Sequence, residues 1–397
     1  MHIIKGQSQI SPADAGYEAA QITALEKHFA RLMDEGILQA GEYALARHGK
    51  TFARGALGRL KYDDAEEPLV PDTPFGVASI TKIVVTVAIM KLVEAGTLSV
   101  YSKLKDICPE FDRPGYDEMT IYHLLTHTSG LVPDPGGFPD IGEQNYYALI
   151  AKYIDAHDAA TDGAFNWLDA AFQIPPRREP DVEWIYSSFG FAILGEVISR
   201  ITQTDCHRFI LEEIAKPLGM NDTMFELTPE LARRHIVKNI EMQAWLADIK
   251  NGRDGRSETD KLWDQIPQTG GGLTSTLGDL LKFGNMCLNM GRLGDTRIVG
   301  RKTFEHFTSR TLYNVPQYMW GAKIKDRAYG LGFDMKRMEY TYSPGSFFHE
   351  GAGGCALLMD PTEGMVAAYH VPFGEKAGGW SAEAVYNTQN IIWGGII

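Results

Sequence analysis

The sequence has few cysteines and no long apolar segment, and each absence narrows the class of protein. Its 397 residues include four cysteines, which form neither a C-x-x-C pair nor a cluster with histidines at zinc-site spacing. We therefore expect reduced cysteines that pack in the interior. No segment stays apolar for about 18 residues, and the first residues contain no apolar stretch of signal-peptide length. These features favour a soluble, cytoplasmic protein without a membrane partner.

Basic residues are also scarce. The chain has 38 Lys and Arg residues against 51 Asp and Glu residues, a net charge of −13, and no basic stripe that would attract a phosphate backbone. A nucleic-acid partner is therefore not expected. The hydrophobic share of 44% and the charged share of 22% are those of a globular protein. A chain of this length predicts one large two-part domain or two domains.

The order of helix and strand patterns predicts a sheet built from both ends of the chain. The helix patterns near the ends are 20–35, 80–95 and 382–393, a hairpin spans 42–54, and the later strand patterns are 329–335, 346–349, 356–359 and 365–371. Between about 100 and 270 the patterns are helical. We predict an α+β fold, in which residues 20–98 and 270–397 form the sheet region and residues 99–269 form a mainly helical region. The cleft between them would hold the functional site.

The first candidate for chemistry is an S-x-x-K motif, Ser79-Ile80-Thr81-Lys82, at the start of the apolar helix. Three residues make about one helical turn, so the Lys82 amine can reach the Ser79 hydroxyl. A serine hydroxyl is a weak nucleophile until a neighbour takes its proton. A lysine can do so when burial lowers its pKa from about 10.4.

The S-x-x-K spacing alone does not identify a nucleophile. Ser102-Lys103-Leu104-Lys105 has the same spacing, but it follows the helix in a polar segment where a lysine would stay hydrated and protonated. Ser79 could also serve only as the N-cap of its helix. Context therefore favours Ser79 over Ser102 without excluding the capping role.

Two further motifs strengthen the case for Ser79. Tyr186-Ser187-Ser188 precedes a predicted helix, and a phenol there could carry a proton between the nucleophile and the leaving group. A buried tyrosine that anchors a helix start is the alternative. His349-Glu350-Gly351 runs into Ala352-Gly353-Gly354, where backbone can approach a ligand closely and an N–H group can complete an oxyanion hole.

With these motifs in order, together with segments 123–131 and 217–220, the chain resembles the class C β-lactamase-like and penicillin-binding-protein-like serine hydrolases. This superfamily includes DD-peptidases, D-aminopeptidases, family VIII carboxylesterases and acyltransferases. The resemblance extends from about residue 20 to the C-terminus. It implies an antiparallel sheet flanked by helices beside a helical region, and no metal or organic cofactor.

The resemblance also implies roles for individual residues. Ser79 is expected to be acylated, Lys82 to act as the base and Tyr186 to handle a second proton. The backbone N–H groups of Ser79 and Ala352 would form the oxyanion hole. Ser188, His349, Gly351 and Ala352 are the expected substrate-binding residues.

Two departures from the family pattern bear on the substrate. Ser188 stands where the family often has Asn, so it offers a hydroxyl but no amide. His349, followed by Glu350, stands where penicillin-recognising members have a Lys that meets the substrate carboxylate. Because histidine is mostly uncharged at neutral pH, this clamp is weakened. We therefore predict hydrolysis of small esters, and of amides as a second choice, through an acyl-enzyme.

The alternatives within the superfamily are a β-lactamase, a D-amino-acid amidase or peptidase, and an acyltransferase. Outside it, His123 and His127 at i, i+4 spacing could suggest a zinc hydrolase, but they lack the Glu of H-E-x-x-H. No serine lies in the G-x-S-x-G frame of an α/β-hydrolase. A non-catalytic binding protein with this fold is the competing hypothesis from another class.

Overall fold

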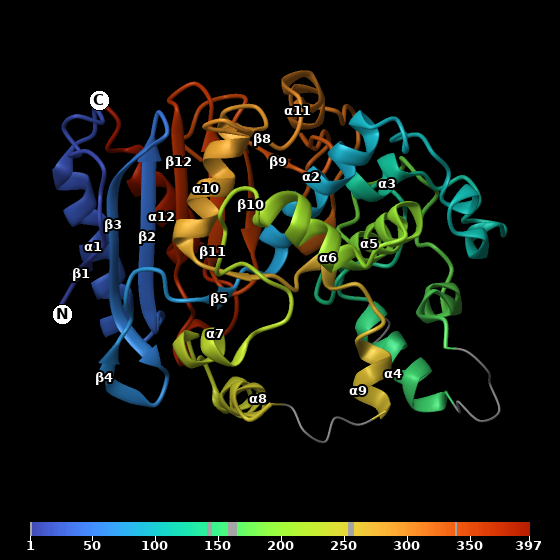
Figure 1. Cartoon of the computed structure of the whole chain (residues 1–397), viewed down its shortest axis with the longest axis horizontal. Helices are drawn as coiled ribbons and strands as arrows, with labels where there is room; N and C mark the ends of the chain where they lie inside the picture. The colour runs from blue at the N-terminus through green and yellow to red at the C-terminus, as the bar shows by residue number, and fades with distance from the viewer. Residues whose placement is uncertain (1, 141–144, 158–164, 253–257, 338–339) are drawn as a thin grey trace.

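The strands of the main sheet come from the two ends of the chain, as predicted (Figure 1). The computed structural model describes residues 2–140, 145–157, 165–252, 258–337 and 340–397. The sheet is antiparallel, has the order β1-β3-β2-β12-β11-β10-β9, and carries β4 beside β3. Its strands are β1 (Ile4–Lys5), β2 (Ala40–Arg47), β3 (Lys50–Lys61), β4 (Asp64–Pro68), β9 (Asp334–Met335), β10 (Phe347–Gly351), β11 (Cys355–Asp360) and β12 (Met365–His370).

The pairing of β2 with β12 joins the N-terminal and C-terminal strands. Tyr43 lies opposite Tyr369 in this pair, and the β2–β3 hairpin continues the sheet on the other side. The hairpin turn contains His48 and Gly49, both with positive φ (49° and 77°). Two central residues with positive φ match the right-handed twist of the flanking strands. The predicted hairpin over 42–54 is confirmed.

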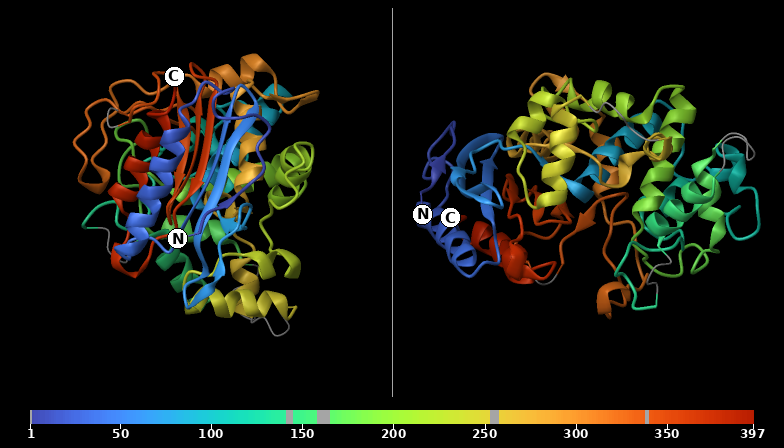
Figure 2. Two further views of the ribbon diagram at one scale, coloured as in Figure 1. Left: turned by 90° about the vertical axis from the view of Figure 1, so that its left-hand side faces the viewer. Right: turned by 90° about the horizontal axis from the view of Figure 1, so that it is seen from below.

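Helices α1 (Ala19–Asp34) and α12 (Ala382–Trp393) lie side by side on one face of the sheet (Figure 2). The apolar stripe of α1, including Leu25 and Phe29, belongs to the same buried cluster as Leu358 and Trp393. Both helices were predicted from their spacing of apolar residues, and both are confirmed. Burial of these stripes covers the face of the sheet turned away from Ser79.

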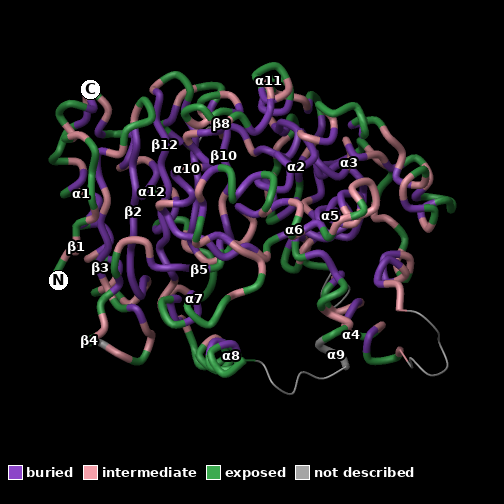
Figure 3. The backbone as a smooth tube through the Cα atoms, in the orientation of Figure 1, coloured by how far each residue is buried: buried purple, intermediate pink, exposed green. Residues whose placement is uncertain are grey.

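The opposite face is covered by α10 (Leu277–Leu288), and α2 (Thr81–Glu94) contributes to the same buried cluster. Helix α10 lies across β2, β11 and β12, whereas α2 packs against helices of the middle region. Ten consecutive residues of α2, 81–90, are buried, which agrees with its apolar composition on all sides (Figure 3). Lys82 is the charged residue among these ten.

The described part of residues 99–269 holds helices and loops and contributes no strand to the main sheet. Its helices are α3 (Ile121–Leu125), α4 (Tyr146–Ala156), α5 (Ser188–Thr202), α6 (Cys206–Ile210), α7 (Pro229–Arg234), α8 (Ile240–Lys250) and α9 (Glu258–Trp263). Helix α11 (Arg301–Thr308) follows later. Two short ribbons pair β5 (Phe75–Gly76) with β6 (Thr274–Ser275) and β7 (Arg292–Leu293) with β8 (Thr296–Arg297).

The predicted strand over 329–335 is wrong for most of its length, because only Asp334 and Met335 pair with the sheet. The N–H of Gly330 donates to the carbonyl of Phe333 (3.0 Å), and Gly332 has a φ of +79°. The segment is therefore a turn. Its alternating apolar residues are buried individually, so they imitate the period-two pattern of a strand.

Among the described residues, no helix is long and apolar enough to cross a membrane.

Candidate active site

Ser79 lies in a single 3₁₀ turn, Ala78–Ile80, that leads into α2. Ala78 has a φ of +46°, a left-handed conformation that costs an L-residue about 1–2 kcal/mol. Lys82 lies one turn further along, fully buried, with its Nζ 3.1 Å from the Ser79 Oγ. The chain therefore brings the predicted nucleophile and the predicted base within hydrogen-bonding distance.

Lys82 has two more oxygen partners and an aromatic surface around its amine. Its Nζ lies 2.9 Å from the Ser188 Oγ and 2.5 Å from the carbonyl oxygen of Gly270. The Tyr186 ring centroid lies 4.7 Å from the same nitrogen. Burial lowers the pKa of Lys82 to about 8, although the negative charge of Asp134 opposes this shift. A substantial neutral fraction is therefore present near pH 8.

Tyr186 lies two residues before the start of α5, and its hydroxyl is close enough to the Ser79 side chain to influence the pKa of the phenol. Burial raises the pKa of Tyr186 well above its ordinary value, and the charge of Asp134 raises it further. The phenol is therefore neutral at any ordinary pH. Lys82 and Tyr186 thus approach Ser79 with different protonation properties, the first able to accept a proton and the second able to donate one.

The loop 126–131 holds the segment that carries Tyr186. The N–H of Ile185 donates to the His127 carbonyl (2.7 Å), and the N–H of Ser187 donates to His127 Nδ1 (3.2 Å). At Gly130, φ is +74°, and an added Cβ would lie 1.8 Å from the Arg178 carbonyl oxygen. A side chain cannot fit there, which explains a glycine in this motif.

His349 lies on β10 near Lys82 and Tyr186, with its ring centroid 6.2 Å from that of Tyr186. Burial lowers the pKa of His349 to about 4, and the positive charge of Lys82 contributes. Its Nδ1 lies 2.7 Å from the carbonyl oxygen of Glu350. The imidazole is therefore neutral at physiological pH.

Glu350 does not accompany His349 into the cleft. Consecutive strand residues face opposite sides of a sheet, and the Glu350 carboxylate bonds to Arg337 (2.7 Å), Tyr340 (2.6 Å) and Gln389 (2.9 Å) on the α12 side. The Glu350 carboxylate and the His349 imidazole therefore lie on opposite sides of the sheet.

Gly351 lets the end of β10 approach the turn that carries Ser79. An added Cβ at Gly351 would lie 2.5 Å from the Val77 carbonyl oxygen and 2.4 Å from the Cys355 Sγ. Ala352 follows in the β10–β11 turn and is exposed. The predicted substrate-binding residues Ser188, His349 and Gly351 thus lie around the Ser79 segment, and Ala352 is next to it in the chain.

Sequence reasoning missed two groups at this site. Asp134 accepts from both the backbone N–H (2.6 Å) and the hydroxyl (2.6 Å) of Ser188, and the Gly270 carbonyl accepts from Lys82. Asp134 lies in the segment Pro133-Asp134-Pro135-Gly136, which has the composition of an ordinary turn. An ionisable residue inside such a loop, close in sequence to a motif, was the available signal. A backbone carbonyl leaves no signal in the side-chain pattern.

The competing motifs have separate partners. Lys105 pairs with Asp112 at 3.3 Å, and the Ser102 Oγ accepts from the Ser99 N–H, so no serine-lysine pair forms there. His123 contacts Asp181 (3.2 Å), whereas His127 lies past the end of α3 with a φ of +57°. These two histidines therefore do not share a helix face. No group of three or more metal-ligating side chains occurs among the described residues.

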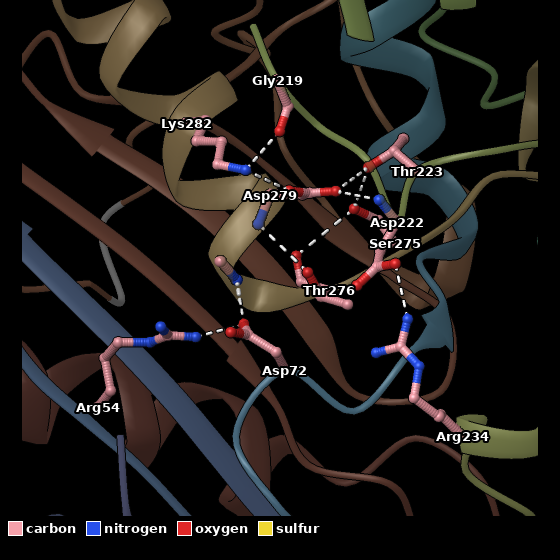
Figure 4. Close-up of polar contacts among 11 residues, drawn as sticks. Arg54, Asp72, Gly219, Asp222, Thr223, Arg234, Ser275, Thr276, Asp279 and Lys282 are labelled. Carbon is pink, nitrogen blue, oxygen red and sulfur yellow. Dashed lines mark hydrogen bonds and ion pairs between the residues drawn. The ribbon is translucent and has the colours of Figure 1, made fainter. Parts of the chain in front are cut away.

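A polar network connects the segment before Ser79 with the start of α10 and with residues 219–223 (Figure 4). Asp72, seven residues before Ser79, pairs with Arg54 and accepts from the Gly278 N–H (2.8 Å). Asp279 accepts from the Asp222 N–H (2.8 Å) and pairs with Lys282 (2.8 Å). This network borders a cavity of about 450 Å³ whose lining residues include none of the candidate catalytic residues. Because its acids are paired with neighbouring groups, we interpret it as a structural frame.

The comparisons with known proteins identify the family of the chain. The Beta-lactamase family model matches residues 25–376. Esterase EstB of Burkholderia gladioli is 33% identical over 226 residues, which cover 55% of each chain. A protein of Escherichia coli (strain K12), named "Putative D-alanyl-D-alanine carboxypeptidase", is 24% identical over 395 residues and covers 90% of this chain and 83% of its own. The crystal structure of a family VIII carboxylesterase has a TM-score of 0.69, 20% identity and 99% coverage of both chains.

The match over most of the length, together with the fold, defines the class as a serine hydrolase with the β-lactamase and penicillin-binding-protein fold. The chain belongs to the Beta-lactamase family.

Proposed function

We propose that this protein hydrolyses small, uncharged esters through an acyl-enzyme on Ser79. The observation that supports this most directly is the contact of 3.1 Å between Ser79 Oγ and a fully buried lysine whose pKa is about 8. A base with a pKa near the working pH combines a useful neutral fraction with adequate basicity.

In the proposed reaction, Ser79 Oγ attacks the ester carbonyl carbon while Lys82 takes the hydroxyl proton. As the tetrahedral intermediate collapses, the ester C–O bond breaks and the leaving alkoxide takes a proton from Tyr186, which regains one from Lys82. Water then attacks the acyl-enzyme with the same groups in reverse, which releases the acid and free Ser79. Tyr186 is assigned as the proton donor because burial keeps its phenol neutral.

The proposed oxyanion hole consists of the backbone N–H groups of Ser79 and Ala352. Within the described part of the chain, neither N–H has a hydrogen-bond partner. The close contact between Gly351 and Val77 brings the two backbone segments together. Two free donors on adjacent segments suit a developing oxyanion.

Two observations favour esters over β-lactams. His349 is neutral where penicillin-recognising relatives carry Lys, so the cleft lacks the expected partner for a substrate carboxylate. In addition, the relative with 33% identity is an esterase, although the match covers 55% of it. The D-aminoacyl amides remain the second substrate class, because a relative along most of the chain is named for carboxypeptidase activity.

The first test is to react the protein with a fluorophosphonate and map the modified residue by intact mass and peptide analysis. We expect a single adduct on Ser79, and we expect p-nitrophenyl acetate hydrolysis to disappear in Ser79→Ala. Ser102→Ala is the matched control and should keep nearly full activity, because Lys105 is paired with Asp112. Equal activity in wild type and Ser79→Ala would end the proposal. Panels of esters, D-aminoacyl amides and a chromogenic cephalosporin then rank the substrate classes.

A further inference from the structure

Ser188 stands between the buried lysine and a carboxylate. Its hydroxyl oxygen is 2.9 Å from Lys82 Nζ and 2.6 Å from Asp134 Oδ2, while its backbone N–H lies 2.6 Å from Asp134 Oδ1. The carboxylate thus holds Ser188 at two points. Lys82, Ser188 and Asp134 form a continuous chain of hydrogen bonds that ends at Ser79.

The directions of these hydrogen bonds follow from the donors available. An ionised carboxylate only accepts, so the Ser188 hydroxyl must give its single proton to Asp134. Its oxygen then accepts from Lys82. The Gly270 carbonyl also only accepts, and it lies 2.5 Å from the same nitrogen. A neutral amine has two N–H bonds, and both are now committed to Ser188 and Gly270.

The nitrogen lone pair then remains for the third neighbour, the Ser79 hydroxyl at 3.1 Å. We propose that Asp134 is a positioning residue that acts through Ser188, orienting the Lys82 amine so that its lone pair faces Ser79. This inference rests on the proposed roles of Ser79 and Lys82. It adds a residue that the family motifs in this sequence do not include.

The charge of Asp134 has a second effect on the same amine. Within the described part of the chain, the titratable groups that face the Lys82 and Ser188 pair are Tyr186, His127, His349, Tyr147 and Asp134. The two histidines are neutral because burial lowers their pKa, and the two tyrosines are neutral because their pKa lies above the ordinary value. Asp134 is therefore the counter-charge that raises the pKa of Lys82, and its removal should lower that pKa.

Asp134→Asn separates the proposal from simple loss of packing because it is nearly isosteric. The new amide oxygen can still accept from the Ser188 N–H, but its NH₂ group then faces the Ser188 hydroxyl and donates to it. The hydroxyl proton must turn towards Lys82 and occupy the lone pair. We expect the plateau rate of Ser79 modification to fall by roughly tenfold or more. The acid limb of the pH profile should move to lower pH.

The readout is the second-order rate of Ser79 labelling by a fluorophosphonate between pH 5.5 and 9.5, followed by intact mass. This rate does not depend on the natural substrate. Asp112→Asn, an exposed carboxylate that makes the same charge change far from the cleft, is the control and should match wild type. If labelling occurs at Ser79 but no ester is hydrolysed, the proposed function fails while this inference is still measured.

Two results would overturn the inference. The first is a pH profile of Ser79 labelling in Asp134→Asn that matches the wild-type profile. The second is a lower plateau rate with an unchanged midpoint pH, which would indicate a purely structural role. A double variant with Ser188→Ala gives a further check, since the plateau losses should not add if Asp134 acts through that hydroxyl. If Asp134→Asn does not fold, Ser188→Ala alone should lower the plateau by roughly tenfold, and an unchanged rate would refute the role.

Discussion

The burial of one lysine amine explains most of the chemistry assigned to this site. Lys82 has three oxygen neighbours, so its ammonium form is well solvated by the protein, yet its desolvation still lowers the pKa to about 8. Because the pKa is close to neutral pH, the charged and neutral forms of the amine differ little in free energy there. Tyr186, by contrast, stays protonated at these pH values because its pKa is raised well above the ordinary value. Two groups with separated pKa values suit the proposed division of the roles of base and acid.

The neutral side chain of His349 leads to a prediction about how substrate preference depends on pH. Because its pKa is about 4, the imidazole stays neutral from pH 8 down to 5.5, and acidification in this range cannot create a carboxylate partner. A charge-assisted hydrogen bond contributes about 1.5–3 kcal/mol. Without it, kcat/KM for penicillins and cephalosporins should be roughly tenfold to a hundredfold lower than in a site that carries a cation at this position.

We therefore expect the ratio of kcat/KM for a cephalosporin to that for p-nitrophenyl acetate to stay constant across this pH range. His349→Lys should raise the ratio. Because Glu350 faces the other side of the sheet, the new ammonium would meet Lys82 and lower its pKa. A wild-type enzyme that hydrolyses cephalosporins far better than any simple ester would contradict the assignment, as would a ratio that climbs on acidification.

At this scale the sequence predicted the residues that carry a motif and missed those that carry none. Ser79 and Lys82 are close in the chain, so helical spacing alone places them together. Tyr186 and His349 came from order and resemblance, and their contacts depend on the tertiary fold. Asp134 resembles any acidic turn residue until the partner of its carboxylate is seen. The Gly270 carbonyl has no side-chain signal at all.

At the scale of the elements, the loop 126–131 requires glycine at position 130. Gly130 and Gly136 both have positive φ, 74° and 77°, but an added Cβ has nothing within 4 Å at Gly136 and would meet Arg178 at Gly130. Gly136→Ala should therefore cost only the backbone strain, about 1–2 kcal/mol. Gly130→Ala should cost about 1–3 kcal/mol more.

Urea unfolding of the two variants, followed by tryptophan fluorescence, measures the difference. Gly130→Ala should also reduce ester hydrolysis, because the loop holds Ile185 and Ser187 on either side of Tyr186. Equal stability of the two variants would show that the Arg178 carbonyl yields easily and that the glycine has no packing role.

The elements that the sequence predicted well are those with long, regular patterns. Helices α1, α2 and α12 and the last two strands match the expected ranges to within one or two residues. The segment 329–335 failed because burial of alternate residues can arise in a turn.

For the whole molecule, buried neutral histidines predict a loss of stability in acid. Burial lowers the pKa of His127, His235, His349 and His370 below the ordinary value of about 6.5. In the unfolded chain these groups take up protons first, so their contribution is complete above about pH 6.5 and is lost as the pH falls towards 4. Each histidine contributes a slope of about 1.4 kcal/mol per pH unit.

His370→Phe should reduce the slope of the unfolding free energy against pH by the contribution of one histidine, about 1.4 kcal/mol per pH unit. Neither ring nitrogen of His370 has a hydrogen-bond partner among the described residues, and the ring stacks on Phe75 with centroids 3.9 Å apart, so a phenyl ring can replace it. Unfolding free energies from urea titrations at pH 4.5, 5.5, 6.5 and 7.5 give the slope. His306→Phe, at an exposed position on α11, is the control. An unchanged slope in His370→Phe would mean that this ring is protonated in the folded protein.

The pairing of β2 with β12 has a consequence for how the protein is made. The hairpin β2–β3 is translated early, but its neighbour in the sheet, Met365–His370, leaves the ribosome more than 300 residues later. At roughly 5–20 residues per second, the nascent hairpin waits for tens of seconds with one edge unpaired. An open edge is a template for pairing with another chain. Newly synthesised protein is therefore most exposed to aggregation before its last strands appear, so shielding of this edge during translation should raise its yield.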